Sequence, residues 1–318
     1  MRENLPRVLE MLIKLCYYKS TRTKVRVPMK TVNLSAYAKI NLFLDITGRR
    51  ENGYHEIDGV MQTVDLCDEI TMTVESGEGI EVVCDSAYAP DGKENIVYRA
   101  AEKYLIANDI EASVKIALTK NIPSPAGMGG GSADAAAVLR GLNGIFRKMT
   151  TVELEALALS IGSDVPFCIS GGTQRVRGVG EVLDELPDLK DCYIVVACGK
   201  DEMPTPAAYK AIDGKYGNFE GENSGGTCDF SEFEGGLEKG EFADKMYNVF
   251  ECVTLGACPS TVQIKESLKK SGALGTLMSG SGPSAFGIFT SEVDASNAAE
   301  ALKREGIFAK VCRPVGRY

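Results

Sequence analysis

A run of glycines in the middle of the chain restricts the fold more than any other feature. Residues 123–134 read Pro-Ser-Pro-Ala-Gly-Met-Gly-Gly-Gly-Ser-Ala-Asp, and apolar side chains follow at Ala135, Val138, Leu139 and Leu142. This spacing places them on one face of a helix that begins directly from the glycine segment. Closely spaced glycines let backbone N–H groups converge on an anion, and a helix N-terminus adds partial positive charge. The segment is therefore either a phosphate cradle or a tight turn that packs the helix against its neighbours.

Familiar nucleotide-binding loops do not match this segment. No Lys-Ser/Thr pair follows the glycines, which excludes a Walker A loop, and Ser132 stands where a G-x-G-x-x-G match counted from Gly127 needs glycine. The protein-kinase H-R-D and D-F-G elements are also missing from the sequence. A polyphosphate bound here would need several backbone N–H donors together with a cation such as Mg²⁺.

Charge and histidine content exclude several classes of function. The formal net charge of −9 disfavours nucleic acid as a partner, because the sequence has no basic patch outside its N-terminal segment. A single histidine, His55, excludes a metal site built from several histidines of one chain. It also leaves Ser-His-Asp hydrolysis dependent on that residue, and no G-x-S-x-G motif accompanies it.

Length and cysteine usage indicate a two-domain protein of a reducing compartment. The 318 residues correspond to about two domains. The 10 cysteines are scattered without a C-x-x-C pair, which is typical of small buried side chains in the cytoplasm. The first 28 residues are basic, and their apolar run at 11–16 is too short for a membrane span. They are either a targeting arm or a disordered or mis-started extension, and we expect an extension, with the folded protein beginning at Met29.

Hydrophobic periodicity predicts an α+β fold that mixes strands and helices without a regular βαβ rhythm. Strands are expected at 35–46, 54–64, 69–74, 113–119, 193–197, 285–289 and 308–312. Helices are expected at 95–107, after the glycine segment, at 150–162, 241–255, 260–270 and 295–304. The polar stretch 214–240 is expected to be a surface excursion without a catalytic role.

Lys39 is a candidate site residue because of its place in the first of these strands. Alternation puts Ala38 and Ile40 on one face, and Tyr37, Lys39 and Asn41 on the other. A row of Tyr, Lys and Asn is costly to bury unless it lines a site. The alternative is a solvated strand face.

Two short segments are further candidates. Asp164 lies in Gly-Ser-Asp-Val-Pro-Phe at 162–167, where it is either a helix N-cap or a carboxylate that accepts a hydroxyl proton. The turn Ser-Gly-Ser-Gly-Pro at 279–283 is either a plain connection or part of a ligand site. Because both glycine segments border strands, we expect them to converge on one ligand.

Taken together, these segments resemble the GHMP kinase superfamily from about Ser35 to the C-terminus. The resemblance rests on residues 38–44, 52–56, 123–136, 162–167, 204–206 and 278–283. It implies a ribosomal-protein-S5-domain-2-like, ATP-binding domain over 29–175 and a ferredoxin-like substrate domain over 176–318.

The Gly-Tyr-His element at 53–55 resembles the branch of the superfamily that acts in isoprenoid precursor biosynthesis. The resemblance implies transfer of the ATP γ-phosphoryl group to the 2-hydroxyl of a cytidylyl-methylerythritol, with Mg²⁺ as cofactor. Asp164 matches the catalytic aspartate and Lys39 the lysine that stabilises charge. The alternatives are a GHMP kinase for another small alcohol and a non-catalytic ligand-binding module; the latter would be expected to lack Lys39 or Asp164, and both are present.

The resemblance also assigns binding residues. For ATP these are Pro123, Ser124, Pro125, Ala126, Gly127, Met128, Gly129, Gly130, Gly131, Ser132 and Ala133. For the substrate they are Asn41, Tyr54, His55, Thr205, Tyr209, Ser281 and Gly282, with His55 hydrogen-bonding the base and the two tyrosines stacking on it. From the sequence alone, a lone histidine such as His55 is more often structural than functional.

The glycine segment departs from the family pattern at two positions. Met128 replaces a leucine and Ala133 replaces a second serine, which leaves Ser132 as the candidate Mg²⁺ ligand. The expected partners are small molecules, with no nucleic acid and no membrane, and the expected state is a monomer or weak homodimer.

Overall fold

The computed structural model describes residues 23–24, 28–86, 88–217 and 228–318. It divides into two compact units, each described here by itself. Among the described residues, unit 1 comprises 23–24, 28–38, 67–86, 88–122 and 130–170, and unit 2 comprises 39–66, 123–129, 171–217 and 228–318. This division differs from the single boundary predicted near residue 175. Two long strands, β2 (Lys30–Arg49) and β3 (His55–Glu75), contribute residues to both units, so neither unit is one continuous segment.

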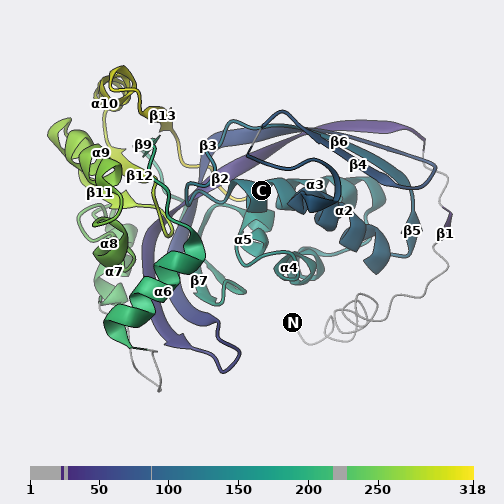
Figure 1. The fold of residues 1–318 in the computed structure, drawn as a ribbon, viewed down its shortest axis with the longest axis horizontal. Helices are drawn as coiled ribbons and strands as arrows, with labels where there is room; N and C mark the ends of the chain where they lie inside the picture. The colour runs from purple at the N-terminus through teal and green to yellow at the C-terminus, as the bar shows by residue number, and fades with distance from the viewer. Residues whose placement is uncertain (1–22, 25–27, 87, 218–227) are drawn as a thin grey trace. The chain divides into compact units, whose positions relative to one another are not determined.

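Unit 1 contains a sheet covered by helices. The second half of β3 pairs antiparallel with β6 (Ser113–Thr119), which pairs parallel with β4 (Ile80–Cys84). Helices α2 (Ile96–Ala107) and α3 (Gly130–Phe146) pack against each other, and α2 also contacts β4 (Figure 1). The apolar positions of β6 alternate with exposed ones, as the sequence predicts for a strand with one face in the core.

The helices of unit 1 begin where capping residues stand. Asn95 caps α2, since its side chain accepts a hydrogen bond from Val97 N. Thr150 and Glu153 form the predicted capping box of α4 (Thr151–Leu159), which precedes the short α5 (Val165–Ser170). α3 begins at Gly130, directly after the glycine segment, which confirms the helix expected there.

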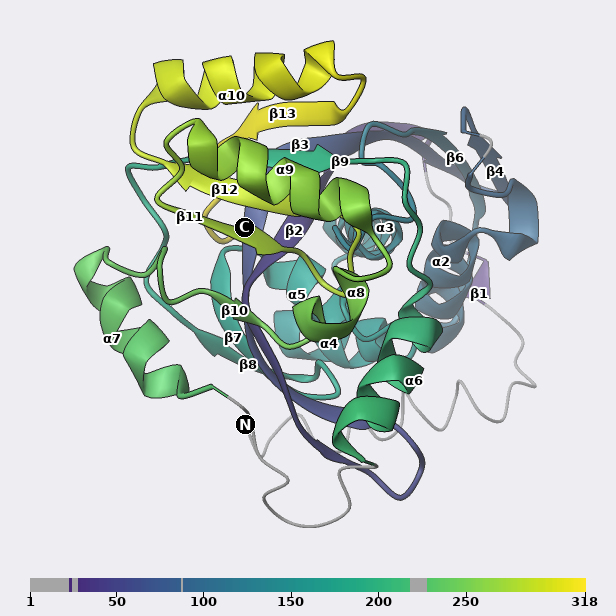
Figure 2. The same ribbon diagram turned by 60° about the vertical axis from the view of Figure 1, so that its left-hand side comes forward.

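Unit 2 contains a sheet in the order β11-β12-β9-β13 in which neighbouring strands are antiparallel. Its strands are β9 (Tyr193–Cys198), β11 (Gly275–Met278), β12 (Ala285–Phe289) and β13 (Phe308–Cys312). Helices α9 (Pro259–Lys270) and α10 (Glu292–Arg304) cover one face of the sheet and share one apolar core with it (Figure 2). This β-α-β-β-α-β arrangement is the predicted ferredoxin-like fold.

The remaining strands of unit 2 are short. The first half of β3 pairs with β7 (Thr173–Gly178), which pairs with β8 (Val182–Glu185). β10 (Tyr247–Asn248) pairs with Phe43 and Leu44 of β2. The sequence analysis did not predict β4, β7, β8, β10, β11 or α6 (Thr205–Tyr216).

The helix predicted at 241–255 is wrong. Only α8 (Glu251–Thr254) is helical there, and β10 precedes it. The reason is the side chain of Asn248, whose Oδ1 accepts a hydrogen bond from Phe250 N while its Nδ2 donates to Met278 O and Gly280 O. These bonds favour a turn of the backbone over a continuous helix.

Two other expectations fall partly outside the described residues. Within 214–240, α7 (Phe230–Lys239) is a helix whose Phe230 and Phe233 pack against Phe43, so this part is more than an irregular excursion. Within the N-terminal extension, β1 (Thr23–Lys24) pairs with β5 (Ile110–Glu111), and residues 1–22 and 25–27 lie outside the described part. Among the described residues, the helices are too short or too polar to span a membrane.

Candidate active site

Lys39 lies on a buried face of β2 in unit 2. The side chains of Ala38 and Ile40 are buried as predicted, but Lys39 and Asn41 on the opposite face are also only 4% and 1% exposed. The interpretation of a solvated strand face is therefore wrong. Lys39 Nζ donates a hydrogen bond of 2.7 Å to Asn41 Oδ1, which offsets part of the cost of burying the ammonium group.

Both glycine segments meet next to Lys39 and Asn41. Lys39 N donates to Met128 O at 3.0 Å, and Gly280 N donates to Asn41 Oδ1 at 3.1 Å. Ser279 Oγ donates to Gly127 O at 3.0 Å, which joins the two segments directly. The expected convergence is thus present in unit 2; that the two segments bind one ligand stays a prediction.

Close approach explains why glycine occupies two of these positions. Gly127 has φ +71°, and a Cβ there would lie 2.3 Å from Ser279 O. Gly129 has φ +68°, and a Cβ there would lie 3.0 Å from Lys39 Cγ. Only glycine adopts these conformations without strain and leaves room for its neighbours.

The turn at 279–283 is held by side chains from three elements of unit 2. Asn248 Nδ2 donates to Met278 O and Gly280 O at 2.7 and 2.8 Å, and Thr254 Oγ1 donates to Ser281 O at 3.2 Å. Thr205 Oγ1 and Ser281 Oγ are hydrogen-bonded at 3.0 Å, so these two predicted substrate residues lie together. The turn is rigidly placed, as a binding turn must be.

A second group of predicted substrate residues surrounds His55. Its ring stacks on Tyr209 with centroids 4.7 Å apart, and its Nε2 is 2.7 Å from Asp213 Oδ1. Tyr209 also contacts the ring of Phe250 edge-on. The side chain of His55 is 8% exposed, whereas Tyr54 is 60% exposed. Tyr54 is thus available for a ring that stacks on it, and His55 is fixed in place.

Asp213 was not among the residues predicted for the site. On α6 it lies four residues after Tyr209, which puts both on the same helix face. This signal was not usable because no helix was predicted at 205–216.

The other predicted site residues lie in unit 1. Gly130, Gly131, Ser132 and Ala133 form the first turn of α3, where Ser132 is half-buried and Ala133 is buried. Asp164 is half-buried and immediately precedes α5, and its carbonyl accepts a hydrogen bond from Cys168 N. This is the position expected for a helix cap, and the catalytic role of Asp164 stays a prediction.

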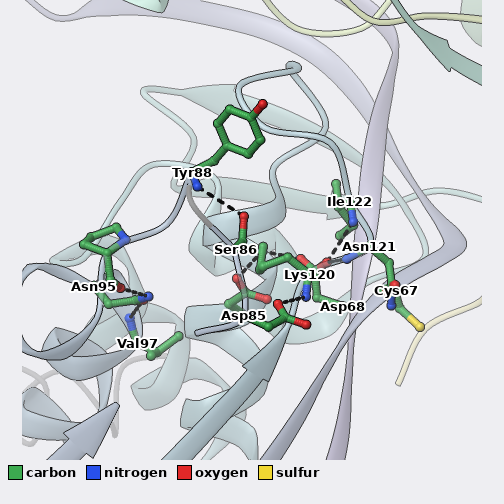
Figure 3. Close-up of polar contacts among 12 residues, drawn as sticks. Cys67, Asp68, Asp85, Ser86, Tyr88, Asn95, Val97, Lys120, Asn121 and Ile122 are labelled. Atoms are coloured by element: carbon green, nitrogen blue, oxygen red, sulfur yellow. Dashed lines mark hydrogen bonds and ion pairs between the residues drawn. The ribbon is translucent and has the colours of Figure 1, made fainter. Parts of the chain in front are cut away.

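Unit 1 also holds a buried ionic network that the sequence analysis missed (Figure 3). Lys120 Nζ donates to Asp68 Oδ2, a contact drawn in Figure 3. It also donates to Asp134 Oδ2 at 2.5 Å. The three side chains are 8%, 0% and 4% exposed, in that order. Burial, together with the charge of Asp68, raises the pKa of Asp134 to about 7, and Lys120 offsets this only in part. Burial opposes the charge of Lys120, but the attraction of Asp134 and Asp68 outweighs it and raises the pKa of Lys120.

Strand parity could have revealed this network. Lys120 continues the inward series of Val114, Ile116 and Leu118, and Asp68 continues the series of Leu66, Ile70 and Met72. Asp134 lies four residues before Val138 on the apolar face of α3. Each of the three charged side chains is thus placed toward the core by the local periodicity.

Comparison with known proteins identifies the class. The model of the GHMP kinases N terminal domain matches residues 95–172, and that of the GHMP kinases C terminal domain matches residues 234–307. Solved structures with this fold include a homoserine kinase from Cytophaga hutchinsonii, with a TM-score of 0.70 at 20% identity over 95% of this chain and 98% of that one. The fold and the two family models together define a two-domain GHMP kinase, as predicted.

More similar relatives narrow the family. A 4-diphosphocytidyl-2-C-methyl-D-erythritol kinase from Geobacter metallireducens is 39% identical over 277 residues, covering 86% of this chain and 95% of the relative. One from Caldicellulosiruptor bescii is 40% identical over 293 residues, covering 90% of this chain and 100% of the relative. A crystal structure of 4-(cytidine 5'-diphospho)-2C-methyl-D-erythritol kinase has a TM-score of 0.73 at 34% identity, covering 90% of this chain and 100% of that one. The chain belongs to the 4-diphosphocytidyl-2-C-methyl-D-erythritol kinase family.

Proposed function

We propose that this protein transfers the γ-phosphoryl group of ATP to the 2-hydroxyl of 4-diphosphocytidyl-2-C-methyl-D-erythritol, a step of isoprenoid precursor biosynthesis. The family supports the reaction type and the substrate. The observation that carries the proposal for the site is the convergence of Lys39, Asn41 and the two glycine segments in unit 2.

The glycine segment and the first turn of α3 hold the ATP phosphates. Their backbone N–H groups and the positive end of the helix dipole favour the anionic chain. Mg²⁺ would arrive with ATP and would neutralise charge on the phosphate oxygens. Mg²⁺ sites in kinases use one or two protein groups together with phosphate oxygens and water. The half-buried hydroxyl of Ser132 would serve as one such group, and Ala133 offers no second hydroxyl. Among the described residues, no group of three or more His, Cys, Asp or Glu side chains is placed to hold a metal ion.

Lys39 and Asp164 assist the transfer. The substrate 2-hydroxyl oxygen attacks the γ-phosphorus, the bond from that phosphorus to the β,γ-bridging oxygen breaks, and ADP leaves with that electron pair. Asp164 accepts the hydroxyl proton, and the ammonium of Lys39 stabilises negative charge in the transition state. Asn41 fixes the Lys39 ammonium, so the charge is placed before the substrate binds.

Cytidine recognition is assigned to the group around His55. The exposed ring of Tyr54 stacks on the base, and Tyr209 supports the recognition surface through its stacked contact with His55. The remaining substrate contacts are assigned to Thr205, Ser281 and Gly282, which belong to the same unit as His55. Thr205 and Ser281 are hydrogen-bonded to each other.

The proposal also covers the roles of the two domains, the cellular compartment and the oligomeric state. Residues 29–175 serve mainly ATP binding and residues 176–318 mainly substrate binding. The buried thiols of Cys258 and Cys312 support a reducing cytoplasm as the working compartment. The protein acts as a monomer or weak homodimer on small molecules.

The decisive experiment is a phosphorylation assay with ATP and Mg²⁺ on the cytidylyl-methylerythritol, run in parallel with homoserine and mevalonate. We expect ADP release coupled to phosphorylation of the cytidylyl substrate, with kcat/KM at least about 10³-fold above that for the other two alcohols. Comparable rates on all three acceptors, or transfer only to homoserine or mevalonate, would contradict the proposal.

A further inference from the structure

A buried carboxylate, Asp68, holds the residues that follow β6, and Lys120 links it to Asp134 of α3. Asp68 Oδ1 accepts hydrogen bonds from Asn121 N and Ile122 N at 2.6 and 2.8 Å, and its Oδ2 accepts from Lys120 Nζ (Figure 3). Residues 120–122 directly precede the glycine segment. One side chain of β3 therefore fixes the three consecutive residues immediately before that segment.

The far end of the glycine segment is fixed by the same group. Lys120 Nζ also donates to Asp134 Oδ2, which lies just after the first turn of α3. At the start of that turn, a Cβ on Gly130 would lie 3.3 Å from Ile122 Cγ2 and 3.5 Å from Asp68 Oδ2. The space beside the start of α3 is therefore bounded by Ile122 and Asp68, and a side chain at position 130 would come close to both.

Stability alone does not account for this arrangement. Two carboxyl groups and one ammonium are buried, so the network carries a large desolvation cost. Asp134 Oδ1 is buried without a hydrogen-bond partner among the described residues. Apolar side chains of similar size would pack this space at no such cost, but they would not specify the directions of the backbone groups at 121 and 122.

We propose that Asp68 is a positioning residue for ATP: together with Lys120 and Asp134 it fixes the first turn of α3, whose backbone N–H groups receive the phosphates. Asp68 acts through the backbone and does not touch the nucleotide. Phosphate donors must be held in position before binding, because a misplacement of about 1 Å costs as much as 10²-fold in rate. This inference rests on the proposed ATP site in the glycine segment and the first turn of α3.

Asp68→Ala tests the role, and Asp58→Asn is the matched control. Asp58 lies on the same strand and forms an ion pair with Arg175 of β7, so its carboxylate has a partner of its own. We expect Asp68→Ala to raise KM for ATP by at least about tenfold, with KM for the cytidylyl substrate changed less than about twofold. Asp58→Asn should change both constants by less than about twofold. Equal effects of Asp68→Ala on both substrates, or an unchanged KM for ATP in a folded variant, would overturn the proposal.

Two additions keep the test decisive. Asp134→Asn preserves size and removes the negative charge that attracts Lys120, which weakens this contact. We expect it to raise KM for ATP by about threefold to tenfold even if Asp68→Ala does not fold. An unchanged KM for ATP in Asp134→Asn would count against the proposal. Calorimetric titration with a non-hydrolysable ATP analogue measures nucleotide binding without phosphoryl transfer, so it tests the positioning role of Asp68 independently of the proposed substrate. Weaker analogue binding in Asp68→Ala supports the positioning role whatever alcohol the enzyme phosphorylates, and unchanged binding refutes it.

Discussion

Gly127→Ala gives a direct test of the meeting between the two glycine segments. Gly127 has φ +71°, a conformation that costs an alanine about 1–2 kcal/mol. The new Cβ would lie 2.3 Å from Ser279 O, where contacts below 3.0 Å essentially never occur. Ser279 O also accepts the hydrogen bond from Gly282 N, so it cannot move away without loosening the turn.

The expected destabilisation follows from these two terms. Separating the Cβ from Ser279 O requires a shift of at least about 0.7 Å (3.0 − 2.3 Å) in a packed turn. Overpacking of this kind typically costs about 1–3 kcal/mol, so the free energy of unfolding should fall by about 2–5 kcal/mol in total. Because the turn also contacts Asn41, the KM for both substrates should rise.

The assay is urea unfolding followed by far-UV circular dichroism, which suits a chain without tryptophan. Gly214→Ala is the matched control: it lies in α6 of the same unit, and a Cβ there meets nothing within 4 Å. In a helix the control should be neutral or stabilising by up to about 1 kcal/mol. If the free energy of unfolding of Gly127→Ala fell by less than about 0.5 kcal/mol relative to wild type, the close contact between the two glycine segments would be refuted.

Four other expectations can be checked on the same protein. Asp164→Asn should lower kcat by at least about 10² with little change in ATP affinity, and kcat within a few-fold of wild type would remove Asp164 from catalysis. His55→Ala should raise KM for the cytidylyl substrate by at least about tenfold and leave that for ATP within about twofold, whereas equal effects would exclude it from base recognition. A chain beginning at Met29 should keep its activity and solubility, and loss of either would show that the preceding segment is needed. The pKa of Asp134 is raised to about 7 in the folded state, so its contribution to stability is present at low pH and lost as the pH rises. Urea titrations should show a decrease of about 3 kcal/mol from about pH 5 to about pH 8 that Asp134→Asn removes, and a pH dependence unchanged in that variant would contradict this assignment.

Local sequence pattern determined much of the fold. Apolar alternation predicts β6 and the first buried face of β2, and helical spacing predicts α2, α3 and α10, because burial of one face imposes a period of 2 or about 3.6 on the side chains. The pattern failed at 241–255, where the side chain of Asn248 bonds to a turn some 30 residues further along the chain. Propensity within a window carries no information about such a partner.

The predicted site residues also had local sequence signals, whereas their contacts with distant residues did not. Motif order and the resemblance to GHMP kinases pointed to Lys39, His55 and both glycine segments, since each carries its own local signal. Neither the burial of the Lys39 face nor the pairing of His55 with Asp213 could be predicted from local pattern. Both depend on distant segments that pack together, and His55 and Asp213 are 158 residues apart in the sequence.

The sequence by itself determined the family, the class of reaction and the residue types that the reaction needs. Tertiary structure decided which of these residues meet: Gly127 and Ser279 come into contact across 152 residues, and Lys120 finds two carboxylates from different elements. The physical reason is that periodicity and turn chemistry act over a few residues, whereas a buried charge or a glycine contact is specified only when distant strands and helices pack together.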